Sequence, residues 1–326
     1  MPFEMRIAMN IVAAALLTSA GPTLAEVFSI QPPIACDLGT DCFIQQYVDH
    51  DLGPGARDFT CGPLSYDGHK GTDFGLPSFA TMHAGVDVLA AAPGTVVAMR
   101  DGMPDTGSDG TPPEQLQNKD CGNGVVIRHA GGYQTQYCHM KQGSVIAKKG
   151  QRVLAGDVLG EVGFSGRTQF PHVHISVRRH GNVVDPFAPD SLDTCGDAQT
   201  GLWADPLQYT PGGFLSAGFA DAVPEYTAIK DGSAARATLS KNAPALVVWA
   251  FAFGGRDGDL IHLSITGPDG PFSSSTATIK GNKAQFFRAA GKKIRRGIRS
   301  GTYQGKIVIE RDGKEIDSIT TSVAVE

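Results

Sequence analysis

Short runs of alternating apolar and polar residues dominate the chain and predict β-strands. Before residue 196, such runs, or runs rich in β-branched residues, lie at 86–91, 95–99, 125–128, 133–137, 151–153, 172–177 and 183–184. Alternate side chains of a strand face opposite sides of a sheet, which gives this period of two. The polar stretch at 102–120 is expected to be a long loop. No pattern predicts an amphipathic helix longer than about a dozen residues.

A second series of alternating runs follows residue 212. These runs lie at 245–253, 260–266, 284–288, 305–310 and 316–325, with turn-forming residues between them. Several short strands in this order predict a small Ig-like β-sandwich. Residues 196–211 contain loop formers and little periodicity, which indicates a linker. We therefore expect an all-β protein, with an antiparallel β-sheet domain at 31–195 and a β-sandwich accessory domain at 212–326.

Composition and charge exclude several classes of protein. Of the 326 residues 41% are hydrophobic, which is enough for a buried core and argues against disorder. A net charge of −5 argues against a general nucleic-acid binder. No apolar run reaches the roughly 18–20 residues that an integral membrane span needs. A basic segment at 292–299 could touch an anionic polymer or a membrane surface, although we favour a solvated loop.

The first 25 residues have the pattern of a signal peptide. Arg6 precedes a mostly apolar stretch at 11–20, and Thr23-Leu24-Ala25 resembles a cleavage site. A membrane anchor is the alternative, but the apolar stretch is short for a span. We therefore expect an exported protein, in a periplasm or outside the cell.

The six cysteines are consistent with export, because an even number in an exported chain suggests disulfides. Strands at 125–128 and 133–137 would form a hairpin that brings Cys121 and Cys138 together at its open end. We expect this pair, and we further suggest Cys36–Cys42 and Cys61–Cys195. A cysteine-liganded zinc site is disfavoured because the chain has no C-x-x-C pair.

Two histidine-containing segments carry candidate chemistry. His172 and His174 are two residues apart on a predicted strand, so both can face one cavity. His69 and Asp73 are four residues apart, roughly 13 Å in a straight strand, so they can share a metal only if the chain bends, which Gly71 would allow. Two imidazoles and a carboxylate form a zinc site with an open position, where bound water becomes more acidic.

The spacing alone does not select one site, because His83 and Asp87 repeat the H-x-G-x-D pattern. The order of the motifs is more specific. It runs YDGHKGTDF from Tyr66, GVDVLAAAPGTVVA from Gly85, CGNGVVIRH from Cys121, YCHM from Tyr137 and GQRVLAGDVLGEVGFSGRTQFPHVHISVRRHGNVVDPF from Gly150. Over residues 61–187 the chain resembles the lysostaphin-type (LytM-like) zinc metallopeptidases, which cleave peptides of peptidoglycan.

This resemblance implies a role for each matching residue. The zinc ligands, for one Zn²⁺ per chain, would be His69, Asp73 and His174. His139 and His172 would be the catalytic pair, one as general base and the other at the oxyanion, in an order that the sequence leaves open. Because the segment from Gly85 matches the strand that follows the family's metal motif, His83 and Asp87 would have no part in the site.

The chain departs from the family pattern near the site. Phe170 stands where glycine is common, Ser176 where a glutamate often follows, and Cys138 in place of a small residue; the segment between Asp73 and Gly85 is longer than usual. None of these changes removes an implied ligand, but they alter the residues that support the ligands and shape the groove.

The expected function is that of an exported zinc metalloendopeptidase acting on peptidoglycan stem or cross-bridge peptides. Within the family analogy, a D,D-type crosslink is a better candidate than a glycine bridge. Two alternatives remain open: a non-catalytic regulator of other cell-wall hydrolases, and a zinc peptidase that acts on a protein. The β-sandwich would position the enzyme or bind a protein or cell-wall partner.

Overall fold

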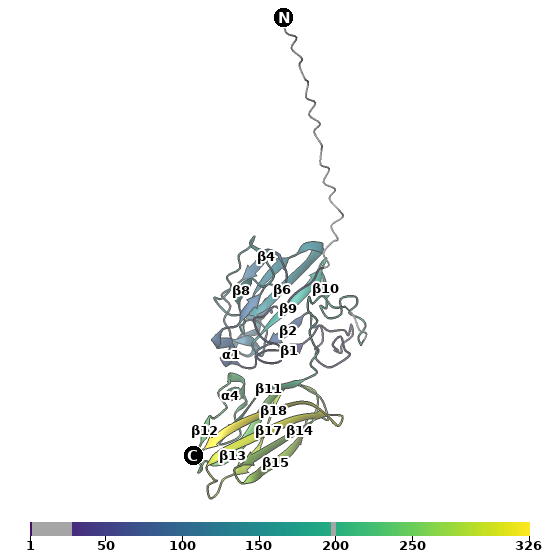
Figure 1. Cartoon of the computed structure of the whole chain (residues 1–326). Coiled ribbons are helices and arrows are strands. Elements are labelled where there is room, and N and C mark those ends of the chain that lie inside the picture. The colour runs from purple at the N-terminus through teal and green to yellow at the C-terminus, as the bar shows by residue number, and fades with distance from the viewer. Residues whose placement is uncertain (2–27, 197–199) are drawn as a thin grey trace.

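The computed structural model describes residue 1, residues 28–196 and residues 200–326. Apart from Met1, the expected signal peptide lies outside the described residues. The described chain is mostly antiparallel β-sheet, which confirms the all-β fold class. Figure 1 shows two stacked units, which we call the N-terminal unit (residues 28–209) and the C-terminal unit (residues 213–326).

The N-terminal unit is built on an eight-stranded sheet in the order β1-β2-β9-β6-β5-β4-β7, with β10 paired to β9. Its strands are β1 (Phe43–Gln46), β2 (Thr72–Gly75), β4 (Gly94–Arg100), β5 (Asn123–Arg128), β6 (Tyr133–Met140), β7 (Arg152–Val153), β9 (His172–Arg179) and β10 (Asn182–Val184). A separate two-stranded sheet pairs β3 (Asp87–Leu89) with β8 (Val158–Glu161). Large side chains such as Phe74, Tyr137 and Ile175 are fully buried and anchor the central strands.

Three short helices lie in segments where the sequence predicts no strand. α2 (Gly107–Gly110) and α3 (Pro113–Leu116) lie in the stretch expected to be one long polar loop. α1 (Phe79–Ala84) occupies the long segment after Asp73, and the side chain of Ser78 caps its first turn. Each is too short to produce a recognisable helical period.

The C-terminal unit packs two sheets face to face. One has the order β11-β13-β16 and the other β12-β18-β17-β14-β15. Their bounds are β11 (Gly213–Ala220), β12 (Thr238–Leu239), β13 (Ala245–Gly255), β14 (Leu260–Gly267), β15 (Gly270–Thr278), β16 (Lys283–Lys293), β17 (Gly301–Arg311) and β18 (Lys314–Val325). Val248 and Phe286 from one sheet and Ile307 and Val323 from the other share a buried core. A short helix, α4 (Tyr226–Asp231), follows β11.

The stretch expected to be a linker packs partly on the N-terminal unit. Trp203 is buried in the core of that unit, and Leu207 and Tyr209 pack against the same core. The Tyr209 hydroxyl donates a hydrogen bond to Asp58 at 2.8 Å. These contacts hold the chain on the N-terminal unit almost to the start of β11.

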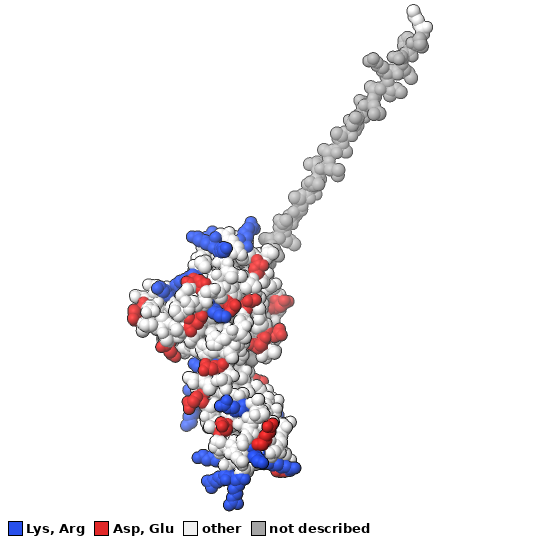
Figure 2. Space-filling view, turned by 90° about the vertical axis from the view of Figure 1, so that its left-hand side faces the viewer, with Lys and Arg blue, Asp and Glu red and all other residues white. Residues whose placement is uncertain are grey.

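All three suggested disulfides are present, and no described cysteine is free. Cys121 and Cys138 join at the open end of the β5–β6 hairpin, as its strand pattern predicts. The basic segment at 292–299 begins at the end of β16 and continues as a largely exposed loop. Lys and Arg side chains gather at the end of the C-terminal unit far from the N-terminal unit (Figure 2). In the described part of the chain, no helix is long and apolar enough to cross a membrane.

Candidate metal centre

Three neighbouring strands bring the candidate residues together. β9 lies between β2 and β6, and its His174 stands opposite Asp73 on one side and Cys138 on the other. His172 is two residues earlier on β9, so both histidines contact the same carboxylate, as the strand period predicts. The chain bends at Gly71, just before β2, which places His69 beside Asp73.

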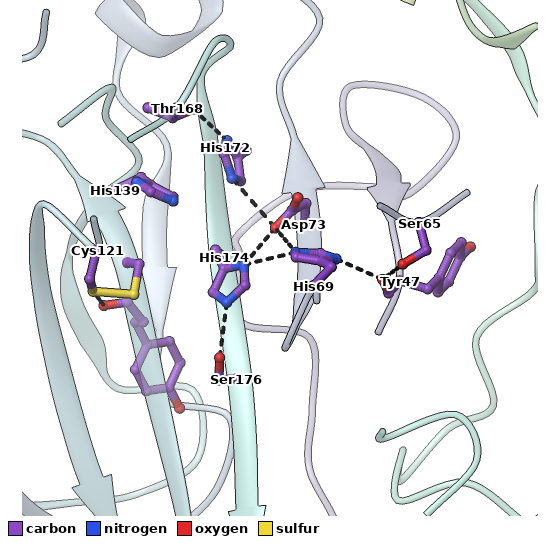
Figure 3. Close-up of polar contacts among 12 residues, drawn as sticks. Tyr47, Ser65, His69, Asp73, Cys121, His139, Thr168, His172, His174 and Ser176 are labelled. Atoms are coloured by element: carbon purple, nitrogen blue, oxygen red, sulfur yellow. Dashed lines mark hydrogen bonds and ion pairs between the residues drawn. A yellow bond between two sulfur atoms is a disulfide. The ribbon is translucent and has the colours of Figure 1, made fainter. Parts of the chain in front are cut away.

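The potential ligand atoms of His69, Asp73 and His174 converge on one point (Figure 3). Asp73 Oδ1 lies 2.8 Å from His174 Nδ1 and 3.3 Å from His69 Nε2, and the two nitrogens are 3.2 Å apart. Two ligands at tetrahedral angles around zinc, each about 2.0–2.1 Å from it, are roughly 3.3 Å apart. The donor set and its spacing therefore fit a zinc ion.

Hydrogen bonds leave the appropriate nitrogen of each ligand available. His69 Nδ1 lies 2.6 Å from the carbonyl oxygen of Tyr47, which only accepts, so Nδ1 carries the proton and Nε2 has a free lone pair. His174 Nε2 lies 2.9 Å from Ser176 Oγ and can donate to it, which frees Nδ1 for a metal. Such outer partners fix the ring orientation of metal-binding histidines.

His139 and His172 face the same space from the other side. His139 Nδ1 donates to the carbonyl of Ser165 at 2.8 Å, and His172 Nδ1 donates to that of Phe170 at 2.9 Å. Their ring centroids are 4.6 Å apart, and His172 Nε2 is 3.4 Å from Asp73 Oδ1. In the neutral rings both Nε2 atoms are therefore proton acceptors directed toward the centre.

Burial and neighbouring charges set the protonation states of the carboxylate and the histidines at this site. Burial alone would raise the pKa of Asp73, but the positive charge that His69 and His172 carry when protonated, with hydrogen bonds from His172 and His174, holds it well below its usual range. Asp73 is therefore a carboxylate. Burial, reinforced by His172 and His174, holds the pKa of His139 well below its usual value, so this ring is neutral at neutral pH.

His139 has an unusual backbone conformation. Its φ is 63°, in the left-handed region that non-glycine residues seldom adopt. Its amide donates to the Cys121 carbonyl at 2.8 Å, and its carbonyl accepts from Gly163 at 3.0 Å. The neighbouring Cys121–Cys138 disulfide fixes the same turn. This local backbone directs the ring toward the metal centre instead of leaving it in the regular strand alternation.

Residues 67–186 match the family model described as Peptidase family M23. These residues form an M23 peptidase domain. The family resemblance drawn from the motifs is thereby confirmed.

The curated relatives of this M23 domain include enzymes named for peptidoglycan chemistry. The DD-carboxypeptidase/endopeptidase Mpg of Neisseria meningitidis is 35% identical over 107 residues, which is 33% of this chain and 22% of the relative. The peptidoglycan DD-endopeptidase ShyA of Vibrio cholerae is 32% identical over 117 residues, 36% of this chain and 22% of the relative. The matched segment thus spans about a fifth of the length of each relative.

Solved structures also align with this region. A zinc containing peptidase from Vibrio cholerae is 24% identical, with a TM-score of 0.33 over 48% of this chain and 39% of that one. The catalytic domain of the prophage-encoded M23 protein EnpA from Enterococcus faecalis is 26% identical, with a TM-score of 0.32 over 48% of this chain and 95% of that one.

Each departure from the family pattern has a visible consequence in the M23 domain. Ser176 is the partner of His174 Nε2, and Cys138 forms the disulfide beside His139. Phe170 stacks on His172, with ring centroids 4.3 Å apart. The repeated H-x-G-x-D motif lies outside the ligand cluster, because His83 is exposed on α1 and Asp87 is exposed on β3.

The metal centre opens into a cavity of about 780 Å³. The M23 domain lines it with Asp73, His139, His172, Tyr66 and Phe170, among others. Sequence reasoning missed further lining residues from the C-terminal unit: Tyr226, Lys230, Ala284 and Gln285. No motif could have found these, since they lie far along the chain and only the packing of the two units brings them to the cavity.

Proposed function

We propose that this chain is an exported zinc-dependent metalloendopeptidase that hydrolyses amide bonds in peptidoglycan stem or cross-bridge peptides. One observation carries the proposal: free ligand atoms of His69, Asp73 and His174 converge at zinc spacing, and Asp73 lines an open cavity together with two further histidines. The M23 match and the names of the curated relatives support the peptidase activity and the peptidoglycan substrate. The disulfides are consistent with export.

In this proposal His69, Asp73 and His174 hold one Zn²⁺, which when bound supplies an acidified water and polarises the substrate carbonyl. His139 and His172 act from the opposite side. Each has its Nδ1 fixed by a backbone carbonyl, so each presents Nε2 to the reacting atoms. One accepts the proton of the water and delivers it to the leaving amine; the other takes a proton at Nε2 from bulk solvent before the reaction and donates a hydrogen bond from it to the developing oxyanion.

The wider organisation is part of the proposal. We take residues 1–25 as the signal peptide, 31–195 as the catalytic domain and 212–326 as an accessory β-sandwich. The hydrophobic clusters support this division, since among the described residues the core of the N-terminal unit contains none from the C-terminal sandwich.

A digestion of purified peptidoglycan sacculi tests the function. Protein would be produced through an exporting host, so that mass spectrometry of its N-terminus reports cleavage after Ala25. It would then be incubated with sacculi, with and without a chelator, beside His174→Ala and the matched control His83→Ala. We expect crosslinked dimers to fall to monomers with wild type and His83→Ala, and chelation or His174→Ala to abolish this.

The other outcomes separate the alternatives. Release that survives both chelation and His174→Ala would contradict the metal mechanism. Binding of one zinc per chain without release from sacculi would contradict the peptidoglycan hydrolase and move the proposal to a regulator or to a protein substrate.

A further inference from the structure

The C-terminal unit forms part of the wall of the metal cavity. α4 contributes Tyr226 and Lys230, and the start of β16 contributes Ala284 and Gln285. The same cavity is lined by Asp73 and His172 of the M23 domain. A substrate bound over the metal centre would therefore touch both units.

A buried glutamine fixes one side of this contact. Gln45 of β1 is only 1% exposed, although it is a polar residue. Its Nε2 donates to the Ala284 carbonyl at 2.9 Å, and its Oε1 accepts from Gln285 Nε2 at 3.0 Å. Both ends of the amide are thus bonded to the other unit. Beside it Phe43 packs on Phe253, with ring centroids 4.7 Å apart. Satisfied buried polar groups of this kind specify one arrangement of the surfaces.

The helices α1 and α4 fix the other side, where they lie next to each other (Figure 1). Gly232, which ends α4, approaches α1 so closely that a Cβ there would be 3.0 Å from Ser78 Oγ and 3.2 Å from the Cβ of Ala80. α1 lies in the long segment between Asp73 and Gly85 that departs from the family pattern. That segment therefore has a structural use: it supports the helix that carries Tyr226 and Lys230.

Lys230 is the one lysine that lines the cavity among the described residues, and no described carboxylate lies within ion-pair distance of it. Its ammonium lies 5.5 Å from the centre of the Tyr226 ring. The other basic lining residue, Arg167, is paired with Asp120. Asp109 also lines the cavity, and Asp73 belongs to the metal centre. Lys230 is thus a cation in the cavity without a bound counter-charge.

We propose that the C-terminal unit completes the substrate groove, in which Lys230 binds a carboxylate of the peptide and Tyr226 packs against its apolar part. This inference rests on the proposed function for the reaction, but it concerns recognition alone. Lys230 would raise the affinity for carboxylate-bearing peptides by a charge-assisted hydrogen bond. It would leave the proton transfers at His139 and His172 unchanged.

The test compares two synthetic crosslinked peptides that differ only in a free carboxylate or its carboxamide. Full-length wild type, Lys230→Gln, Lys230→Arg and the control Lys314→Gln would be assayed with zinc; Lys314 is an exposed residue of β18 that does not line the cavity. For the carboxylate peptide we expect Lys230→Gln to raise KM about tenfold with little change in kcat. Lys230→Arg should restore most of the loss, and the carboxamide peptide should not distinguish the variants.

Equal effects of Lys230→Gln on both peptides, or no effect on either, would overturn the inference. If wild type hydrolyses neither peptide, the proposed function fails. The affinity of the groove for each labelled peptide can then still be measured by fluorescence anisotropy. A preference of wild type for the carboxylate peptide that Lys230→Gln removes would support the groove. Equal binding of the two peptides by wild type would refute it.

Discussion

Gly71 makes the metal centre sensitive to a single methyl group. A Cβ at this position would lie 2.5 Å from His174 Nε2 and 2.4 Å from the backbone oxygen of Ile175. Gly71 does not have a left-handed φ, so Gly71→Ala incurs no backbone strain of that kind and acts through the collision alone. The glycine that the sequence suggested for a bend is thus needed mainly for the close approach of β9.

The size of the collision sets the expected effect. Ordinary contact begins near 3.4 Å, so the imidazole of His174 must move by about 0.9 Å or β9 must move away from β2. Metal–ligand distances tolerate only about 0.2 Å. We expect zinc affinity to fall at least tenfold. Overpacking of this kind should also lower the free energy of unfolding of the metal-free protein by about 1–3 kcal/mol.

Competition with a chromogenic zinc chelator measures the affinity, and denaturant unfolding measures the stability. Gly258→Ala is the control, because Gly258 has a φ of +89° but no atom within 4 Å of the added Cβ. It should lose about 1 kcal/mol of stability from backbone strain and keep its zinc affinity. A Gly71→Ala protein that binds zinc within threefold of wild type would refute the reasoning.

Three further substitutions should change zinc affinity or stability by amounts that follow from the contacts they remove. Ser176→Ala removes the partner of His174 Nε2 and should weaken zinc binding about 10–100-fold, measured by the same competition; unchanged affinity would mean that water replaces the hydroxyl. His50→Gln breaks the fully buried pair with Asp185, 2.7 Å apart, and should cost about 3–5 kcal/mol of unfolding free energy. Burial lowers the pKa of His50, but the interaction with Asp185 is stronger, so the pKa is raised above its usual value. The stabilisation that His50 provides is therefore complete below pH of about 6.5 and is lost as the pH rises through the folded-state pKa. A difference in unfolding free energy between wild type and His50→Gln that grows with pH would contradict this. The Cys61–Cys195 disulfide closes a loop of 134 residues. Replacing both cysteines should lower the free energy of unfolding, measured with denaturant, by about 5 kcal/mol. A decrease of less than about 2 kcal/mol would show that other contacts restrain the loop without the disulfide.

The sequence predicts the strands that are long and carry several large apolar residues, whether one face is buried, as in β17, or both faces are, as in β13. β13, β14, β16, β17 and β18 all lie where alternating apolar residues indicated strands. β11 and β15 escaped detection because small residues fill β11 and serine and threonine fill β15, so neither shows strong apolar alternation. α1 and α4 are six residues each, which is less than two helical turns.

The clustering of the candidate ligands was within reach of sequence reasoning because strand geometry and local motifs determine it. The strand period places His172 and His174 against one carboxylate, and the hairpin pairs Cys121 with Cys138. The cavity wall was not within reach. Lys230 comes to the cavity only through the contact of α4 with α1 and of β16 with β1, and no local pattern encodes packing between segments so far apart in the chain.

The positions that conflict with ordinary folding preferences lie around the metal centre. A carboxylate, Asp73, is fully buried; a histidine, His139, has a left-handed backbone; and Gly71 leaves no room for a side chain. Each feature costs stability, of the order of 1–3 kcal/mol for a strained residue, and persists because strands, carbonyl partners and a disulfide hold it. Zinc binding at His69, Asp73 and His174 would recover part of this cost, because binding to the folded state alone adds to the free energy of folding. The residues proposed to act in the reaction are therefore also the ones whose conformations cost stability. The zinc ion that the proposed reaction needs would, when bound, stabilise these same residues.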